Sequence, residues 1–370
     1  MIKHKDHFHG SDLEKIEEVY GIKKEDITSF SANVNPLGIS PKLRSSLIDH
    51  IDAITSYPDR EYTSLRRRIG AYVGAPAESI LVGNGSTELI SLFIQMEHPK
   101  KALILGPTYS EYEREISLGG GTSLYFPLKE EDDFVLHPEA FRTALNESID
   151  LLVICNPNNP TGTGIAPELL ERILCLAAEK HIFVLLDECF CDMAETEPGI
   201  RSMLPCLEQY PHVLVLKSLT KLYAIPGLRL GYGLCADTEL VEKIRQTGQP
   251  WPVNTLAEEA GIAALHAEEY REKSLSFLQD ERWRLYDELG KLGFRVWKPS
   301  ANFVFFRAEG CPDLDERLIP YGILLRHCDN YVGLGVDDYR AAVRLPEENA
   351  YLLRCLRQVM EEVLLWWQNR

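Results

Sequence analysis

The sequence predicts an α/β fold, with a large domain built on a mostly parallel sheet and a smaller α+β domain at the C-terminus. The first observation is length, because 370 residues exceed what one simple core organises. The second is the alternation of short apolar runs with helical patterns between about residues 63 and 236. The third is a change of pattern near residue 247. We expect a large domain over residues 41–246, a small domain over 247–370, and an N-terminal segment (1–40) packed with the small domain.

Five apolar runs are the strand candidates of the large domain. They lie at residues 79–82, 102–105, 151–155, 182–186 and 213–216. Nearly continuous apolar strands, each followed by a loop and a helix, are typical of a parallel sheet that is covered on both faces. Ligands bind beyond the carboxyl ends of the strands in such sheets. We therefore expect functional side chains to follow these runs directly.

The C-terminal part predicts a different architecture. Residues 258–289 have the apolar spacing of a long helix, in two phases. Residues 294–297 and 302–306 alternate like strands of a smaller antiparallel sheet. A final helix carries apolar side chains at helical spacing over residues 352–363.

The composition excludes several classes of protein. A hydrophobic content of 45% argues against extended disorder, and no apolar run is long enough to span a membrane. The formal charge of −17 disfavours nucleic acids and anionic membranes as partners. The nine cysteines form no C-x-x-C pair and the N-terminus has no apolar signal region, so we expect a cytoplasmic protein. His4, His7 and His9 fit a solvated end better than a metal site, and we expect no metal.

The stretch after the fifth run places a lysine where chemistry is expected. Lys221 follows Ser218 in a turn, and Arg229 lies between two glycines downstream. Burial is costly for an ammonium and lowers its pKa, which makes the amine a nucleophile toward an aldehyde. A lysine, hydroxyls and an arginine together suit a phosphorylated aldehyde. This combination indicates pyridoxal 5'-phosphate as the cofactor.

Other polar residues follow the earlier runs. Asp187 comes directly after the fourth run, where a carboxylate can pair with a protonated pyridine nitrogen; a helix N-cap is the alternative interpretation. The turn with Gly85, Ser86 and Thr87 opens a helix, and free N–H groups at a helix start favour phosphate. A plain strand-to-helix connection is the alternative for this turn. Both positions match the predicted edge of the sheet.

Two loops add candidates for contacts with the cofactor ring. Asn159 lies in a loop that two prolines and a glycine make rigid, so its amide can be presented to a ring hydroxyl. Tyr109 follows the second run and is a candidate for stacking on the ring. A half-buried loop tyrosine without a functional role is the alternative interpretation of Tyr109.

Three arginines near the C-terminus lie among apolar residues, at Arg326, Arg340 and Arg344. Arginine makes bidentate contacts with carboxylates and phosphates, so a pair at one cleft suits a substrate with two anionic groups. Surface ion pairs are the alternative, and they are our expectation for Arg344 alone. Because the net charge repels anions, the attraction must come from such local arginines.

Taken together, these residues resemble the fold-type I pyridoxal-phosphate enzymes of the class I/II aminotransferase superfamily, over nearly the whole chain. Within it, the chain is most similar to the threonine-phosphate decarboxylases of cobalamin biosynthesis, relatives of the histidinol-phosphate aminotransferases. The likeness lies at residues 9–10, 30–38, 57–59, 83–85, 218–229, 249–254 and 328–334. It implies fold type I, with a seven-stranded mostly parallel sheet and a homodimer that shares its active sites.

The resemblance implies a role for each candidate residue. Lys221 would bind the cofactor covalently, Asp187 would pair with the ring nitrogen and Tyr109 would stack on the ring. The remaining cofactor contacts would come from Gly85, Ser86, Thr87, Asn159, Ser218 and Arg229, and from Tyr57 of a second subunit. The substrate contacts would come from Arg340 at the α-carboxylate, from Arg326 at the phosphate or carboxylate, and from Asn33 and His9 in the N-terminal segment.

The implied activity is decarboxylation of an O-phospho-amino acid, above all threonine phosphate to aminopropanol phosphate. Phe190 stands where most aminotransferases of this group have a tyrosine, and the decarboxylases share this phenylalanine. Ser86 stands where both groups commonly have an acidic residue. The alternatives are a histidinol-phosphate or related aminotransferase, a serine-phosphate decarboxylase, and a regulatory module without catalysis. The presence of Lys221 and Asp187 argues against the last of these.

Overall fold

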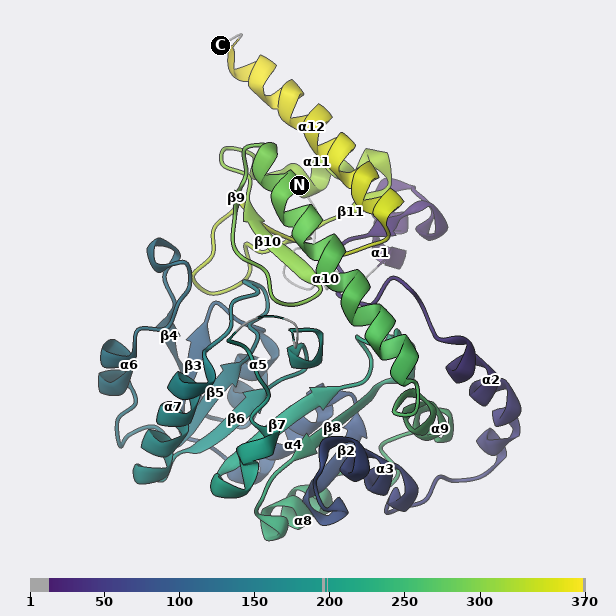
Figure 1. The fold of residues 1–370 in the computed structure, drawn as a ribbon. Helices are drawn as coiled ribbons and strands as arrows, with labels where there is room; N and C mark the ends of the chain where they lie inside the picture. The colour runs from purple at the N-terminus through teal and green to yellow at the C-terminus, as the bar shows by residue number, and fades with distance from the viewer. Residues whose placement is uncertain (1–12, 195–196, 198, 369–370) are drawn as a thin grey trace.

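A seven-stranded sheet forms the large part of the molecule (Figure 1). The computed structural model describes residues 13–194, 197 and 199–368. In spatial order the strands are β2 (Ile80–Asn84), β8 (Leu230–Leu234), β7 (Val213–Ser218), β6 (Phe183–Asp187), β5 (Leu151–Cys155), β3 (Lys101–Gly106) and β4 (Thr122–Pro127). β8 runs antiparallel to both of its neighbours, β2 and β7, and the other pairs of the sheet are parallel. The predicted mostly parallel sheet is confirmed, and each of the five apolar runs is one of its strands.

Two strands of this sheet, β4 and β8, have no continuous apolar run that would predict them. β8 reads Leu-Gly-Tyr-Gly-Leu, and a Cβ added to Gly231 would lie 2.3 Å from the backbone nitrogen of Ser86. The glycine is therefore required by the close approach of the helix that begins at Ser86. β4 is an edge strand that pairs only with β3, and its side chains are at most half-buried. An edge position removes the need for apolar residues on both faces.

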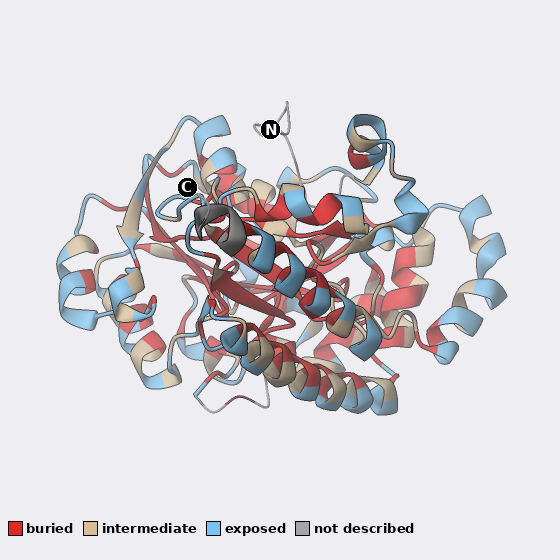
Figure 2. Ribbon diagram, turned by 90° about the horizontal axis from the view of Figure 1, so that it is seen from above, coloured by how far each residue is buried: buried red, intermediate tan, exposed pale blue. Residues whose placement is uncertain are grey.

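Helices cover the sheet and connect its strands. In chain order they are α1 (Leu13–Tyr20), α2 (Pro41–Asp49), α3 (Thr63–Val73), α4 (Ser86–Glu97), α5 (Glu111–Leu118), α6 (Pro138–Ala144), α7 (Pro167–Glu179), α8 (Thr238–Thr247), α9 (Thr255–Ala264), α10 (Glu268–Lys291), α11 (Leu314–Leu318) and α12 (Pro346–Gln368). Figure 2 shows buried central strands with helices that expose their outer faces. This is the layered packing expected for a sheet buried on both sides.

A second sheet, of four antiparallel strands, builds the C-terminal part. Its order is β12 (Arg326–His327), β13 (Asp338–Ala342), β10 (Phe303–Arg307) and β9 (Arg295–Val296). The predicted antiparallel sheet is therefore confirmed. β1 (Thr28–Ser29) pairs in parallel with β11 (Ile323–Leu324), which brings the N-terminal segment to this part of the molecule.

The single long helix predicted over residues 258–289 is wrong, because the structure has two helices there. α9 ends at Ala264 and packs on α2, α3 and β8, whereas α10 starts at Glu268 and runs toward the small sheet. The two phases of apolar spacing correspond to these two directions. Leu278 in α10 belongs to the core of the large sheet, and Leu285 belongs to the core of the small sheet. Among the described residues, none of the helices is both long and apolar enough to cross a membrane.

Candidate active site

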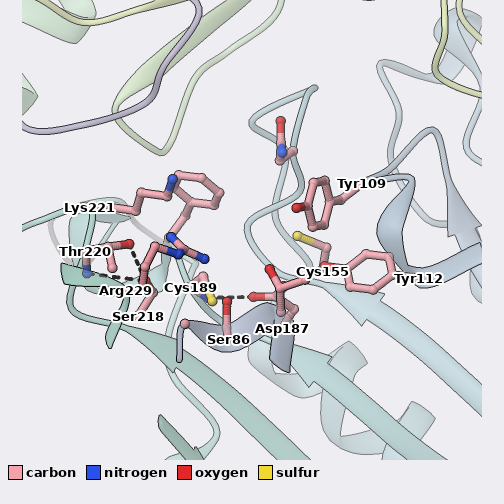
Figure 3. A pocket seen from close by; sticks show the side chains of 14 residues that line it. Ser86, Tyr109, Tyr112, Cys155, Asp187, Cys189, Ser218, Thr220, Lys221 and Arg229 are labelled. Atoms are coloured by element: carbon pink, nitrogen blue, oxygen red, sulfur yellow. Dashed lines mark hydrogen bonds between the residues drawn. The ribbon is translucent and has the colours of Figure 1, made fainter. Parts of the chain in front are cut away.

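A cavity of about 160 Å³ lies at the carboxyl ends of β5, β6 and β7, next to the start of α4 (Figure 3). This is the edge of the sheet where the sequence predicts functional side chains. The predicted residues that line it are Gly85, Ser86, Thr87, Tyr109, Asn159, Asp187, Ser218, Lys221 and Arg229. The fold therefore brings together residues that are up to 144 positions apart in the chain, from Gly85 to Arg229.

Asp187 is held at the floor of the cavity by two donors. Its Oδ2 accepts a hydrogen bond from the hydroxyl of Tyr112 at 2.6 Å, and its Oδ1 accepts one from the backbone nitrogen of Cys189 at 2.9 Å. The carboxylate is only 6% exposed. Burial also raises the pKa of the Tyr112 phenol well above its usual value, so this group donates and does not ionise. The carboxylate is thereby fixed in place, with its free lone pairs available to a cation.

Lys221 presents its amine to the same cavity from the turn after β7. Burial lowers the pKa of this amine, and the positive charges of Arg340 and Arg229 lower it further, against an opposing effect of Cys189. A lowered pKa increases the share of neutral amine, which is the nucleophilic form. In Figure 3, Lys221 and Arg229 lie across the pocket from Tyr109. The amine can therefore reach a group placed between them.

The start of α4 forms one end of the cavity and suits an anion. Gly85 is the N-cap residue with a positive φ of 79°, and a Cβ at this position would lie 2.4 Å from Nη2 of Arg229. Any larger residue would therefore displace the guanidinium. The hydroxyls of Ser218 and Thr220 hydrogen-bond each other at 2.8 Å beside it. Backbone N–H groups of a helix start, two hydroxyls and an arginine form a complete set of donors for a phosphate.

Arg340 reaches the edge of this cavity from the small sheet. Its Nη1 donates to Oδ1 of Asn159, and its Nη2 donates to the carbonyl oxygen of Ser31 at 2.6 Å. The guanidinium lies 5.3 Å from the centre of the Phe303 ring, and its Nε has no hydrogen-bond partner. In the part of the chain that the structure describes, no carboxylate lies within ion-pair distance of Arg340. A buried cation without a carboxylate partner is stabilised when it binds an anion, so Arg340 is suited to binding an anion from outside the chain.

Arg326 stands directly opposite Arg340, because the two residues are register partners on β12 and β13. Arg326 donates to Oδ1 of Asn330 at 2.9 Å and lies 5.1 Å from the centre of the Tyr331 ring. Like charges opposite each other destabilise a strand pair. Two arginines at this position are therefore balanced best by a ligand that carries negative charge.

The remaining predicted residues are placed differently. Asn33 is buried, and its Oδ1 has no hydrogen-bond partner. Tyr57 is 81% exposed, packs on Trp251 with ring centres 4.7 Å apart, and does not line the cavity of its own chain. His9 lies outside the described residues, so its predicted substrate contact stays a prediction.

The cavity also contains residues that the sequence analysis did not assign. Tyr112 lies in the first turn of α5, three residues after Tyr109, and nothing in the sequence distinguishes it from an ordinary core residue of that helix. Thr220 precedes Lys221, and Cys155 and Cys189 lie beside Asp187. Burial raises the pKa of the Cys155 thiol to about 12, so the thiol is neutral. A cysteine at the end of a strand is a weak sequence signal for an active-site residue, since most buried cysteines only pack in the core.

The arrangement is chemically specific. It offers an amine for an aldehyde at Lys221, a fixed carboxylate for a protonated ring nitrogen at Asp187, and a phosphate site at the start of α4. The phenol of Tyr109 closes the side of the cavity, with its ring edge-on to Tyr112 at 5.6 Å. These residues fit a phosphorylated pyridine aldehyde, and the arginines at the edge of the cavity fit an anionic substrate.

Comparisons with known proteins agree with this geometry. The model of the family "Aminotransferase class I and II" matches residues 25–351. The chain is 38% identical to a threonine-phosphate decarboxylase of Salmonella typhimurium over 354 residues, which cover 95% of this chain and 96% of that protein. It is 32% identical to an adenosylcobalamin biosynthesis bifunctional protein of Leptospira interrogans, over 93% of this chain and 40% of that longer protein. Among solved structures, the histidinol-phosphate aminotransferase of Clostridium acetobutylicum matches with a TM-score of 0.84 and 33% identity, over 90% of this chain and 99% of that one.

Proposed function

The chain belongs to the aminotransferase class I and II family, and on that premise we propose that it is a pyridoxal-phosphate-dependent decarboxylase of threonine phosphate. The observation that carries the substrate class is the pair Arg326 and Arg340, which stand opposite each other in the small sheet, with Arg340 bonded to Asn159 in the lining of the cavity. A substrate with both a carboxylate and a phosphate satisfies two such cations. Its product would be aminopropanol phosphate, and we place the reaction in cobalamin biosynthesis, as the names of the similar proteins suggest.

Lys221, Asp187 and the start of α4 would hold the cofactor. Lys221 would bind its aldehyde carbon, Asp187 its ring nitrogen, and Ser86, Ser218 and Arg229 its phosphate. When bound, pyridoxal phosphate supplies a ring that accepts the electron pair left when a bond to the substrate Cα breaks. Asp187 supports this role because Tyr112 and the backbone nitrogen of Cys189 hold its carboxylate in place.

The side chains of this protein would then perform the following work. Arg340 would bind the substrate carboxylate and set its angle to the plane of the ring, which decides whether the bond to CO₂ or the bond to hydrogen breaks. Arg326 would bind the second anionic group. Lys221, once its amine is free, would donate a proton to Cα in the place that CO₂ leaves. The ring of Phe303 lies beneath the guanidinium of Arg340, and the ring of Phe190 packs edge-on to the ring of Phe303 at 5.2 Å. These two rings would exclude water from the side of the cavity that faces Arg340.

A histidinol-phosphate aminotransferase remains the second candidate, because the similar solved structure from Clostridium acetobutylicum is such an enzyme. The same residues would serve, with Lys221 removing the Cα proton instead of returning one. Phe190 favours decarboxylation, because the resemblance places a phenylalanine there in the decarboxylases and a tyrosine in most of the aminotransferases. Without that tyrosine, Asn159 is the main predicted donor to the ring hydroxyl. Serine phosphate is the nearest alternative substrate, and one methyl group changes selectivity only modestly.

We also propose that the enzyme is a homodimer in which Tyr57 contacts the cofactor of the other subunit. Large apolar side chains are exposed around this residue, at Ile48, Ile51, Ile54 and Trp251. A second copy of the chain would cover them. We propose a cytoplasmic location, because none of the nine cysteines, all of which lie among the described residues, forms a disulfide.

The test is an assay of three substrates with the cofactor-loaded enzyme. Threonine phosphate, serine phosphate and histidinol phosphate are incubated separately, and CO₂ release is measured alongside amine transfer to a keto acid. The proposal predicts CO₂ from threonine phosphate, less from serine phosphate and slow or no amine transfer. Transfer from histidinol phosphate without CO₂ from either phospho-amino acid would overturn it in favour of the aminotransferase.

A further inference from the structure

We propose that Asn35 is a positioning residue: it holds the backbone of the Lys221 turn and couples this turn to the anion site at Arg340. The proposal rests on the proposed function, in which Lys221 binds the cofactor and Arg340 binds the substrate. Asn35 itself does not line the cavity. It lies in residues 28–38, which we call the N-terminal strap.

The contacts of Asn35 converge on the lysine turn. Its backbone nitrogen donates to the carbonyl oxygen of Lys221 at 3.0 Å. Its side-chain Nδ2 donates to the carbonyl oxygen of Leu222 at 2.8 Å and to the hydroxyl of Ser274 in α10 at 2.8 Å. Asn35 is only 2% exposed, so water does not compete for these bonds. Two consecutive carbonyls of the lysine turn therefore depend on one residue of the strap.

The other end of the strap is bonded to the strand that carries Arg340. The carbonyl oxygen of Phe30 accepts from the backbone nitrogen of Ala342 at 2.7 Å, two residues after Arg340. The carbonyl oxygen of Ser31 accepts from Nη2 of Arg340 at 2.6 Å. The anion site and the lysine turn are thus joined through only five residues, 31–35.

This connection is stiff enough to transmit a change of position. Pro36 restricts the backbone of Asn35 to extended conformations. The Oδ1 of Asn35 accepts from the backbone nitrogen of Leu37 at 3.1 Å, which fixes the orientation of the amide. A carboxylate of the same size could still accept this bond but could not donate to Leu222. The donor function of the amide is therefore the specific property that the coupling requires.

The consequence is a link between substrate binding and the position of the amine. An anion at Arg340 holds the guanidinium, and the guanidinium holds Ser31 and the strap. A strap that is held more firmly restrains the carbonyls of Lys221 and Leu222 through Asn35. Misplacement of a reacting group by about 1 Å can cost roughly 100-fold in rate, so such restraint at the lysine matters for catalysis.

The test is hydrogen exchange of the cofactor-loaded enzyme with and without 3-phosphoglycerate. This probe has a carboxylate and a phosphate but no amine, so it occupies the anion site without reacting. In the wild type we expect the probe to slow exchange by at least roughly threefold both at residues 30–32 and 340–342 and at residues 221–225. In Asn35→Asp we expect slowing at the strap and β13 only.

A matched variant and a second measurement separate positioning from a general loss of structure. Ser274→Ala removes one bond of the same amide and leaves the bond to Leu222, so the probe should still slow exchange at residues 221–225. In Asn35→Ala and Asn35→Asp, kcat should fall roughly 10-fold or more with a smaller change in KM, and the pH at which the cofactor absorbance changes should shift. Ser274→Ala should keep both properties.

The outcomes distinguish this proposal from the proposed function. Equal slowing at residues 221–225 in the wild type and in Asn35→Asp would overturn the role of Asn35 while leaving the proposed function intact. A wild type without a cofactor absorbance band, or one in which the probe leaves residues 340–342 unchanged, would overturn the proposed function, and the coupling with it. The wild-type measurements thus test the proposed function, and the comparison of the wild type with Asn35→Asp tests the role of Asn35.

Discussion

Two neighbouring regions at the ends of β6 and β7 differ in whether their buried charged side chains form ion pairs. Behind the cavity, Lys217 is only 2% exposed, and its Nζ lies 3.1 Å from Oε2 of Glu188 and 2.7 Å from Oδ1 of Asp192. In the cavity, Asp187 accepts only neutral donors, and no carboxylate lies within ion-pair distance of the Lys221 amine in the described part of the chain. Asp187 ends β6 and Glu188 follows it, while Lys217 lies in β7 and Lys221 in the turn after β7, so the two regions share the same two backbone segments.

The difference shows how a charged side chain that is part of the folded core can be told from one that serves the active site. Burial and the neighbouring carboxylates act in opposite directions on Lys217, and the carboxylates prevail and raise its pKa well above the usual value. Burial lowers the pKa of Lys221, which has no such partner. A buried charge whose partner lies within the chain is already compensated by the fold, whereas one without a partner is available to a ligand. The predictions below test this distinction from the largest effect to the smallest.

Substitution of the unpaired lysine should remove activity almost completely. In Lys221→Ala the amine that binds the cofactor and moves the proton is absent, so we expect CO₂ release to fall by roughly 10⁴-fold or more. Steady-state CO₂ assays with threonine phosphate measure this loss. Activity within tenfold of the wild type would contradict the role of Lys221.

Substitution of the paired lysine should instead reduce stability. Lys217→Met leaves Glu188 and Asp192 buried without their cation, so the free energy of unfolding should fall by about 3–5 kcal/mol. Urea unfolding of the cofactor-free protein measures it, and the folded fraction should still bind the cofactor through Lys221. Lys291→Met is the control, because this exposed lysine pairs with Glu288 at the surface and its loss should change little. Equal effects of the two substitutions would remove the distinction between the regions.

Substitution of the arginine without a carboxylate partner should impair substrate binding. In Arg340→Gln the substrate carboxylate loses its cation, and kcat/KM should fall by roughly 10²–10³-fold with little loss of stability. Arg344→Gln is the matched control, because Arg344 pairs with Glu348 at 2.8 Å and is not expected to touch the substrate. If the two variants lost activity to a similar extent, Arg340 would have no special role at the cavity.

The smallest effect concerns a carboxyl group outside the cavity, Glu258 at the start of α9. Burial raises its pKa to about 7, with a further contribution from Asp59 and Glu259. The folded state therefore binds the proton more tightly than the unfolded state, and this group's contribution to stability is present below its ordinary pKa and lost as the pH rises toward 7. Glu258→Gln should raise stability at pH 8 by about 1–2 kcal/mol and leave it unchanged at pH 4.

Thermal unfolding across this pH range measures the effect. Glu259→Gln serves as the control, because it removes the neighbouring carboxylate of the same helix, whose side chain is about a third exposed. A gain at pH 8 that persisted at pH 4 would show that the substitution acts through packing and not through the proton.

The sequence was sufficient to predict the strands that are buried on both faces and the residues at their ends. Asp187 and Lys221 could be found because each directly follows such a strand, where ligands bind. β8 could not, because Gly231 is determined by the close approach of Ser86, a contact between distant segments. The break between α9 and α10 depends on the same kind of information, since it follows from where each helix packs.

The parts of the site that escaped prediction depend on side-chain neighbours. Tyr112 looks like an ordinary core residue of α5, and only the fold shows that its hydroxyl reaches Asp187. Asn35 looks like a turn residue before a proline, and only the fold brings it to Leu222. The role predicted for Tyr57 stays a prediction, because it requires a second subunit.

The most direct test of the central claim asks which lysine binds the cofactor. The loaded enzyme is reduced with borohydride, digested, and the modified peptide is mapped by mass spectrometry. We predict that the pyridoxyl group lies on Lys221, with Lys217 unmodified because its amine is paired with Glu188 and Asp192. A pyridoxyl group on Lys217, or on any lysine outside the cavity, would contradict the assignment of the active site.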